Sequence, residues 1–582
     1  MKKHFYILGM SLFSTALIAQ SQDTLWTATV AGSSIVQTQF LSPVDSIAMQ
    51  TQTADEVWQY NPRVQLRSYA PGQVVTMGVG GAGSGQTALS WDGIPLNSAA
   101  TGIVDVSTIP ASMVHSGSVQ SGATNASAGF GSLLGHIDLS MAQVQKSTLN
   151  VALNQNAIGN TGVSIYNALK KEHSSNQFTV QLNNFRNNYS YNYGALAGQV
   201  SGMDAEVLSY LHQWKRALGG GDWQTDMWFT GANRSNSGSV LVAGTPSYLT
   251  DRNIRVKSSW KRNKGQWQVY WANEVQSFTD STYGIQDTNG YRGFIAQYAY
   301  TAEKFTVGGQ MEYHTVYGSN RVGSRPSGTV FLKHKTGRYS TLEAKGALYG
   351  ITPMWSAKWA AARRLSTNTQ GYASVAKNYR MPTLNDLYWT PGGNPDLLPE
   401  ASWNATAGLK SSGKGLTFTT ELSTSYFNNL IQWVPGTGNV WTPVNLQNAW
   451  ISNIDQSIAW NHGNWNTAVQ YSLTLARQNG KQLIYIPVHG AVAKAHYQFT
   501  KLISAQGALT IRSARHTLRD NSSIGVLPAE YWVDFQLLYR PSSHLVVQGG
   551  AQRLTNVQCS QFQYFPLPSN IIYIQLNLNL KQ

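Results

Sequence analysis

Long runs of alternating apolar and polar residues constrain this chain more than any other feature. The runs recur at 178–183, 267–271 and 531–540, and the chain ends in one whose apolar members are Ile572, Ile574, Leu576, Leu578 and Leu580. Successive side chains of an extended strand point to opposite faces. Each run therefore predicts a strand with one apolar face. In water such faces need a covering layer, whereas lipid covers them in the wall of a membrane barrel.

The composition separates a membrane barrel from a soluble protein. Aromatic residues make up 11% of the chain and charged residues only 12%, the latter about half the usual share. No segment has the roughly 18 consecutive apolar residues that a membrane-spanning helix needs. A secreted β-sandwich or propeller also alternates, but many runs here are long and carry aromatic residues near their ends, as in membrane-interface girdles. We therefore expect an all-β transmembrane barrel.

The pattern of apolar and polar residues changes near residue 140. At roughly 20 residues per strand and connection, residues 141–582 predict about 22 antiparallel strands, the size class with a plugged lumen. Residues 38–140 are shorter and mixed, and we expect a small α/β plug domain inside that lumen. Thr53 and Glu56 have capping-box spacing, which predicts a short helix that ends before Pro62. Residues 540–544 predict a tight turn between strands.

The N-terminal residues have the pattern of a secretory signal peptide. Lys2 and Lys3 precede an apolar run that ends near Ala19, so residues 1–19 are expected to be removed. The cleavage site has no cysteine, which argues against a lipoprotein. Residues 20–37 form an N-terminal segment ahead of the plug. The sole cysteine, Cys559, excludes an intramolecular disulfide and a cysteine-cluster metal site.

The net charge of +15 does not by itself identify a partner. Lysine and arginine are scattered, and a secreted chain meets little nucleic acid, so no nucleic-acid partner is expected. Attraction to anionic lipopolysaccharide of an outer membrane or to an acidic ligand remains open. Solvated loops that carry the charge are the simpler alternative.

Gly78, Gly80 and Gly83 spell the dinucleotide-binding fingerprint, but its context is absent. That fingerprint must open a helix and be followed by an acidic residue about 20 positions later. Residues 84–93 instead predict a strand and turn, and Asp92 comes too early. We expect these glycines to serve turns and packing. The sequence has no zinc-protease or Walker motif, and Ser84 lacks a nucleophile elbow; no enzyme, catalytic residue, cofactor or metal site is expected.

The order of several motifs resembles that of TonB-dependent outer-membrane receptors. The matching plug segments are 61–64 (NPRV), 68–73 (SYAPGQ), 86–97 (QTALSWDGIPLN), Ile109-Pro110 and 122–132. The matching barrel segments are 379–389 (YRMPTLNDLYW) and 392–400 (GGNPDLLPE). The resemblance implies a bacterial outer-membrane barrel with an N-terminal plug. It also implies import of a small-molecule ligand, driven by TonB with its ExbB-ExbD complex.

In this family a short extended segment near the mature N-terminus, the TonB box, is captured by strand addition to TonB. The segment that fits by position and β-propensity is Asp23, Thr24, Leu25, Trp26, Thr27, Ala28 and Thr29. A disordered tail is the alternative.

The chain departs from the family pattern at linked positions. Gly80-Gly81 stands where Arg-Gly is usual, Ser116 and Ser118 stand where glutamates are usual, and the last residue is Gln582 rather than phenylalanine. Because both signs of charge are missing together, no unpaired charge is left in the plug. Three hypotheses remain: a TonB-dependent importer, a passive porin, which the plug argues against, and an outer-membrane binding or structural protein that has lost transport.

Within the family, the resemblance is to the vitamin B12 (cobalamin) transporter branch, of the Bacteroidetes type. It rests on residues 69–73, 392–397, 431–436 and 441–445 and implies a corrinoid ligand, with a ferric siderophore or haem as the alternative. The candidate ligand contacts are Gln86, Asn97, Ser98, Trp433 and Trp441. The two tryptophans could instead gird the membrane interface.

Two further expectations concern the outer surface. Residues 381–399 have the length and composition of an outer loop. The calcium-binding aspartate cluster of some family members is not evident, which leaves open a surface lipoprotein partner.

Overall fold

The computed structural model describes residues 38–39, 53–111, 116–121, 132–141, 143–241, 246–337, 339–349, 352–435, 441–445, 448–555 and 558–581. The expected signal peptide and the segment Asp23–Thr29 lie outside these residues.

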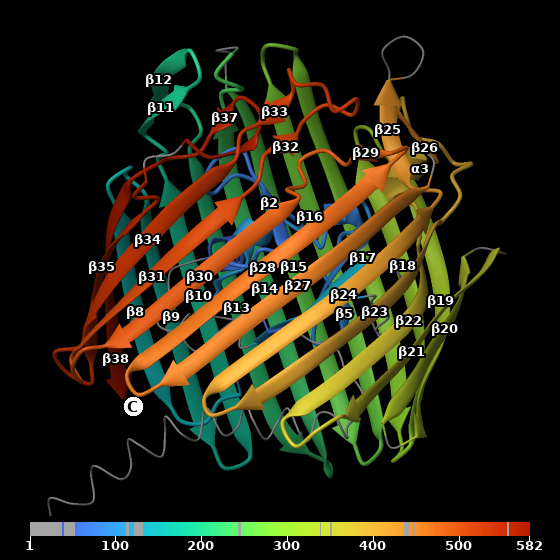
Figure 1. Cartoon of the computed structure of the whole chain (residues 1–582). Coiled ribbons are helices and arrows are strands. Elements are labelled where there is room, and N and C mark those ends of the chain that lie inside the picture. The colour runs from blue at the N-terminus through green and yellow to red at the C-terminus, as the bar shows by residue number, and fades with distance from the viewer. Residues whose placement is uncertain are drawn as a thin grey trace, which may run out of the picture.

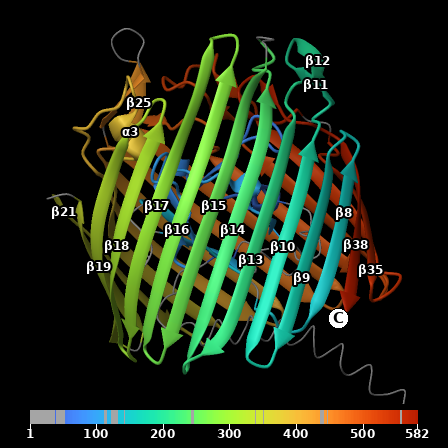
Figure 2. The same cartoon turned by 180° about the vertical axis from the view of Figure 1, so that it is seen from behind.

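A closed antiparallel barrel of 22 strands forms the body of the molecule (Figures 1 and 2). The two-residue strand β29 (Lys481–Gln482) lies beside β28 and is counted separately. The last strand pairs with the first, with Leu576 opposite Leu153, and this pairing closes the wall. The barrel strands are β8 (Thr148–Asn156), β9 (Thr161–Lys171), β10 (Ser174–Phe185), β13 (Ala205–Leu218), β14 (Gly221–Asn236), β15 (Ser247–Arg262), β16 (Gly265–Asp280), β17 (Ile285–Thr301), β18 (Phe305–Gly318), β19 (Gly323–Gly337), β20 (Ser340–Tyr349), β21 (Thr352–Arg364), β22 (Thr369–Arg380), β23 (Glu400–Gly413), β24 (Leu416–Asn428), β27 (Ala449–His462), β28 (Trp465–Gln478), β30 (His489–Gln498), β31 (Ile503–Arg512), β34 (Glu530–Tyr539), β35 (Leu545–Gln552) and β38 (Ile571–Lys581).

The alternation of the sequence becomes an apolar outside and a polar inside. In β38, Ile572 and Ile574 are 65% and 53% exposed, whereas Gln575 and Asn577 are 1% and 2% exposed. The apolar row faces outward, where a bilayer would cover it, and the amide row faces the lumen. The strand class and the strand count predicted from the sequence are both confirmed.

The two ends of the barrel differ. Short turns connect the strands at one rim, where the C-terminus lies, and the turn at 540–544 joins β34 to β35 as predicted (Figure 1). The other rim carries longer loops with their own elements: β11 (Tyr189–Tyr193), β12 (Leu196–Val200), β25 (Ile431–Pro435), β26 (Trp441–Asn445), β32 (Arg515–His516), β33 (Val526–Leu527), β36 (Ser560–Phe562), β37 (Phe565–Pro566) and the helix α3 (Leu384–Tyr388). No helix among the described residues is long and apolar enough to cross a membrane.

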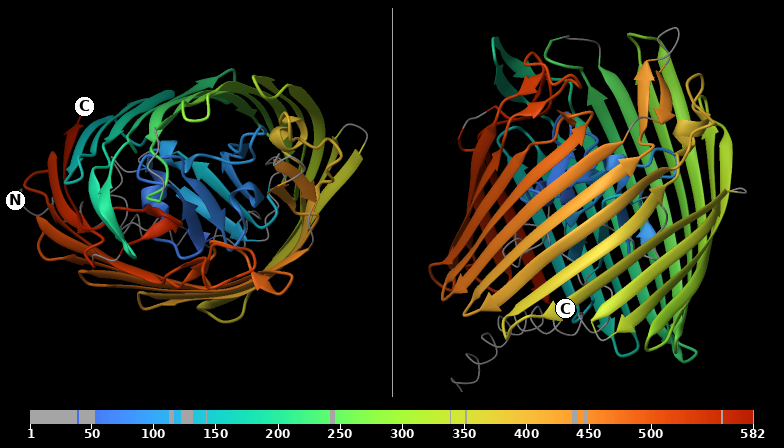
Figure 3. Two further views of the ribbon diagram at one scale, coloured as in Figure 1. Left: turned by 90° about the horizontal axis from the view of Figure 1, so that it is seen from above. Right: turned by 45° about the vertical axis from the view of Figure 1, so that its right-hand side comes forward.

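A small mixed domain lies inside the lumen (Figure 3). Its sheet has the order β1-β6-β7-β4-β5, and β2 pairs with β3 beside it. The predicted helix is α2, and the Thr53 N–H donates to Glu56 Oε2 (3.2 Å), as the capping box requires. The elements are β1 (Thr38–Gln39), α2 (Ala54–Trp58), β2 (Val64–Arg67), β3 (Thr76–Val79), η1 (Ser84–Gln86), β4 (Thr87–Trp91), β5 (Ile94–Pro95), η2 (Val106–Thr108), β6 (Ser116–Ser121) and β7 (Gly135–Ser140).

The plug and the wall share buried surfaces. The plug core, with Trp91 and Ile137, continues into Leu211 and Trp228 of the barrel. The Trp91 and Trp228 rings meet edge to face, with their centroids 5.3 Å apart, a favoured aromatic geometry. The plug is therefore packed against the wall rather than loosely enclosed.

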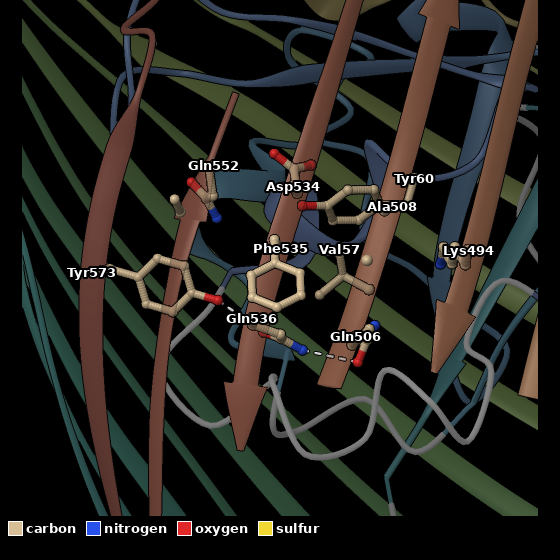
Figure 4. Close-up of a pocket in the computed structure, with 12 residues that line it drawn as sticks. Val57, Tyr60, Lys494, Gln506, Ala508, Asp534, Phe535, Gln536, Gln552 and Tyr573 are labelled. Atoms are coloured by element: carbon tan, nitrogen blue, oxygen red, sulfur yellow. Dashed lines mark hydrogen bonds between the residues drawn. The ribbon is translucent and has the colours of Figure 1, made fainter. Parts of the chain in front are cut away.

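A second contact seats α2 against the lumen wall around a cavity of about 40 Å³ (Figure 4). Val57 and Tyr60 of the plug face polar side chains of the barrel there. The Tyr573 hydroxyl donates to Gln536 Oε1 (2.8 Å), and Gln536 Nε2 donates to Gln506 Oε1 (2.8 Å). These bonds link β31, β34 and β38 through both polar atoms of the Gln536 amide on the wall beside α2.

Candidate functional site

The glycine-rich segment of the plug is a close-packed turn. A Cβ atom at Gly78 would lie 2.2 Å from the carbonyl oxygen of Ala82, and one at Gly81 would lie 2.8 Å from Thr474 Cγ2 of the wall. Gly80 and Gly81 also have positive φ angles of 59° and 88°, which favour glycine. The segment continues into a three-residue 3-10 turn and a strand rather than a helix. The prediction of turn and packing roles is confirmed.

Gly78→Ala is expected to destabilise the plug because its Cβ would meet backbone rather than a movable side chain. A cost of roughly 1–3 kcal/mol is typical of such overpacking. Gly328→Ala is the matched control, since its Cβ has no neighbour within 4 Å among the described residues. Limited proteolysis and thermal melting of the purified protein would measure the difference. Equal stability of the two variants would contradict the packing role.

Plug and outer loops meet at α3. The backbone N–H groups of Leu384 and Asn385 donate to the carbonyl oxygens of Ala99 and Ala100, both at 2.9 Å. These donors belong to the first turn of α3, which has no partner for them within the helix. A loop of the plug therefore caps a helix of the loop 381–399 at the rim opposite the C-terminus (Figure 1).

Two of the three plug residues predicted as ligand contacts lie beside this junction. Gln86 Nε2 donates to Glu400 Oε1 of β23 (3.4 Å). Ser98 is buried, and its hydroxyl accepts the Ala100 N–H (3.3 Å). Asn97 serves the plug itself, because its side chain bonds the backbone of Leu89, Thr87 and Gly102.

Trp433 joins the same region from the barrel side. Its indole N–H donates to Asp386 Oδ1 of α3 (2.8 Å), and Asp386 also accepts the Thr383 N–H in a capping box (2.9 Å). Strand β25, which carries Trp433, pairs with β26, which begins at Trp441. The side chain of Trp441 lies outside the described residues. The structure thus gathers Gln86, Ser98 and Trp433 around the loop 381–399. We call this rim of the barrel, opposite the C-terminus, the mouth.

A cavity of about 130 Å³ opens between the plug loop and the wall strands β14–β17. Ser98 and Asp105 line it from the plug, and Arg255 and Glu274 line it from the wall, where they form an ion pair of 2.6 Å. Arg321, whose guanidinium lies 5.1 Å from the Trp389 ring centroid, closes the outer side. This cavity offers polar groups to a ligand, although Arg255 and Glu274 are paired with each other and Asp105 is paired with Arg234.

Aromatic side chains gather at the other side of the mouth. Tyr69 of the plug lies 4.8 Å from Phe562 and 4.6 Å from Phe565, measured between ring centroids. Phe562 also meets Tyr485 at 5.4 Å, and the Arg67 guanidinium lies 5.7 Å from the Tyr485 ring centroid. All five side chains keep some exposure. Such a cluster can stack on a flat or apolar part of a ligand.

Among the described residues, three ionic clusters attach the plug to the wall. Plug Arg63 contacts Glu421 (3.2 Å) and Asp455 (3.3 Å) of the barrel. Plug Asp92 contacts Lys257 of the barrel (2.9 Å), which also contacts Asp226 (3.2 Å). In the third cluster, Arg234 of the wall bridges plug Asp105 (2.5 Å) and Asp251 (2.6 Å). The sequence alone did not indicate these three ionic clusters or the aromatic cluster around Tyr69.

The polar residues inside the plug also pair with one another. The Ser90 hydroxyl lies 2.8 Å from His136 Nε2 and donates to Asp138. Because the carboxylate bonds the hydroxyl rather than the imidazole, this is not the order of a hydrolase triad. Burial lowers the pKa of His136 to about 4, so the ring is neutral at pH 7. No group of three or more histidine, cysteine, aspartate or glutamate side chains that could hold a metal occurs among the described residues.

Family models match both parts of the chain. The model described as TonB dependent receptor-like, beta-barrel covers residues 110–555, and the TonB-dependent Receptor Plug Domain model covers residues 34–136. The chain belongs to the TonB-dependent receptors. The closed barrel with this family membership places the protein in the bacterial outer membrane. The family consists of transporters rather than enzymes, and it implies energy coupling through TonB and a small-molecule ligand.

The relatives of this receptor differ in what they carry. The vitamin B12 transporter BtuB of Vibrio vulnificus is 23% identical over 445 residues, 69% of each chain. BtuB of Photobacterium profundum is 25% identical over 478 residues, 75% of each chain. Among solved structures, the siderophore receptor PirA from Acinetobacter baumannii superposes with a TM-score of 0.75 at 13% identity, covering 91% of this chain and 96% of that one. The FrpB iron transporter from Neisseria meningitidis gives 0.77 at 12% identity, covering 94% and 99%. These structural likenesses show the shared fold.

The orientation of the receptor can be tested with a single added cysteine. Asp396→Cys lies in the exposed part of the loop 381–399, and Ser542→Cys lies in the turn at the opposite rim. The native Cys559 is 3% exposed, and burial raises the pKa of its thiol to about 12, so it should not react. On intact cells a membrane-impermeant maleimide should label Asp396→Cys alone. Labelling of Ser542→Cys alone would reverse the topology.

Proposed function

We propose that this receptor imports a corrinoid such as vitamin B12, with energy from the inner-membrane proton-motive force. The observation that carries the proposal is the mouth, where an aromatic cluster and an amide-lined plug junction face each other across the plug. A corrinoid is large and amphipathic, and it suits walls that offer rings and amides with most charges already paired. The names of the BtuB relatives support the same ligand class.

In this proposal, the energy for transport comes from the periplasmic side of the outer membrane. Asp23–Thr29 would be the TonB box that adds as a strand to TonB, which in turn works with ExbB-ExbD. Gln86, Ser98 and Trp433 would contact the ligand directly or through the loop 381–399, and Trp441 would act from β26. Asn97 would act indirectly, since its amide holds the shape of the loop that follows it. A surface lipoprotein could assist the outer loops, and lipopolysaccharide would surround them.

A ferric siderophore or haem is the second candidate ligand. It is favoured by Arg67 and Arg321 at the mouth, because guanidinium groups bind carboxylates and other anions. A third possibility, binding without transport, rests on Gly80-Gly81 and the serines at 116 and 118, where the family usually has charges.

Complementation distinguishes these functions. The receptor should restore growth to a strain that lacks other corrinoid importers when cobalamin is limiting. If it restores use of an iron chelate instead, the corrinoid assignment is wrong and the importer class survives. If it restores neither while it still binds a ligand at the cell surface, the third possibility holds.

Phe562→Ala tests the aromatic cluster within this proposal. The variant removes the ring that bridges Tyr69 and Tyr485, and we expect corrinoid binding to weaken by about tenfold, equal to roughly 1.4 kcal/mol. Tyr283→Ala is the control, because Tyr283 is an outer-rim aromatic with 78% exposure. Binding of labelled cobalamin to whole cells measures both. Equal affinities would remove the cluster from the site.

A further inference from the structure

The outward face of the barrel carries an open apolar groove of about 820 Å³. It crosses β21, β22, β23, β24 and β27, which lie side by side on one flank (Figure 1). Small residues form its floor, and large apolar residues form its sides. The floor residues are Gly371, Ala373 and Ala407, and the flanking residues are Trp359, Leu409 and Leu422.

The groove faces the membrane rather than the lumen. Glu421 and Asp455 point inward, since both contact Arg63 of the plug. Their strand neighbours Leu422 and Ile454 therefore point outward, because side chains alternate along a strand. Their exposures of 54% and 36% agree. This face is the part of the wall that lipid covers.

The hollow results from a local change in side-chain size. Along the same outward rows, Val375 follows Ala373 and Trp403 precedes Ala407, with exposures of 53% and 57%. A Cβ atom at Gly371 would lie 3.1 Å from Leu365 Cδ1, so the glycine makes room for the Leu365 side chain, which lines the groove near the short turns. The groove is thus bounded by Val375 and Trp403 toward the outer rim and lined by Leu365 and Arg363 toward the short turns.

The end of the groove near the short turns is basic. Arg363 lines it and is exposed. Its guanidinium has no hydrogen-bond or ion-pair partner within the part of the chain that the structure describes. The strand ends and turns at 360–371 and 408–418 contain no aspartate or glutamate. Arg363, Arg364 and Lys414 are exposed there, whereas Lys410 follows the outward Leu409 and faces the lumen. Positive charges of this kind, close to the membrane surface, attract the anionic headgroups of lipids.

We propose that this groove binds one phospholipid of the periplasmic leaflet, with its acyl chains in the hollow and its phosphate on Arg363. The apolar floor and sides would bury acyl methylenes. A guanidinium can hold a phosphate through two parallel hydrogen bonds. The part of the groove that would hold the acyl chains lies along the outer face of the wall, and the part that would hold the phosphate lies near the short turns. A lipid of the periplasmic leaflet has the same orientation. The site is independent of the transported ligand.

Native mass spectrometry of the full-length receptor, released from nanodiscs that contain phosphatidylglycerol, tests the site. Ala373→Trp and Ala407→Trp fill the groove, and each should lower the retained lipid by about tenfold. Ala505→Trp is the matched control, because Ala505 faces outward on β31 beside Leu537 and lies outside the groove. Arg363→Gln should lower retention of phosphatidylglycerol while the groove stays open.

Heat-modifiable migration in a gel would verify that every variant is folded. Equal lipid retention by Ala373→Trp and Ala505→Trp would overturn the site. Release of the unchanged protein without any retained phosphatidylglycerol would also overturn it. If Arg363→Gln retains phosphatidylglycerol as well as the unchanged protein does, the assignment of the phosphate to Arg363 is wrong.

Discussion

Deletion of Asp23–Thr29 is expected to abolish ligand uptake and to leave ligand binding intact. Under the proposed function, the ligand binds at the mouth, whereas energy would enter from the periplasm through Asp23–Thr29. Uptake of labelled cobalamin should fall to the level of cells without the receptor. Surface binding at low temperature should match that of the intact receptor. Equal uptake by the deleted and intact forms would exclude this segment as the coupling site.

A point variant sharpens the same test. Strand addition uses backbone N–H groups, and proline lacks one and has a fixed φ. Leu25→Pro should therefore stop uptake, whereas Leu25→Ala, which keeps the backbone donor, should retain most of it. If both variants lose uptake equally, the Leu25 side chain rather than the strand geometry matters.

Lys257→Met is expected to destabilise the seated plug by about 3–5 kcal/mol, the usual cost of breaking a buried ion pair on one side. Lys257 is 1% exposed through its side chain and lies between Asp92 of the plug and Asp226 of the wall. Its ammonium also lies 4.3 Å from the centroid of the Trp91 ring. Its loss would leave two carboxylates without their cation. Thermal denaturation, followed by heat-modifiable migration, and protease sensitivity of the plug would report the effect.

The triple variant Lys257→Met, Asp92→Asn, Asp226→Asn is the control for charge. Removing all three charges together leaves no uncompensated ion, so most of the lost stability should return. If the triple variant is as unstable as Lys257→Met, the cluster acts through packing against Trp91 rather than through charge.

The barrel could be predicted because its signal is local. A period of two along β38 or β34 is visible in a window of ten residues, and the bilayer favours that pattern in barrel strands. Short turns such as 540–544 carry their own proline and serine signals. The helix α2 was predictable for the same reason, since Thr53 and Glu56 specify its start within four residues.

The site was harder to predict because its parts come from distant segments. Arg63 meets Glu421 and Asp455 only after the wall closes, and nothing near Arg63 in the sequence indicates a partner. Charges usual in the family are absent at residues 80, 116 and 118, but nothing in the sequence indicates that Asp92 and Asp105 pair with Lys257 and Arg234 of the wall. Asn97 is a candidate ligand contact because it lies on a loop after the glycine-rich segment, and the structure adds that its amide bonds the plug backbone. Such hydrogen bonds become visible only in three dimensions.

Uptake and binding of labelled cobalamin, measured on the same cells with and without a protonophore, test the central claim most directly. The protonophore should reduce uptake to the bound fraction while surface binding stays unchanged. Uptake that continues without the proton-motive force would contradict an energised importer, and the absence of binding would contradict the corrinoid ligand.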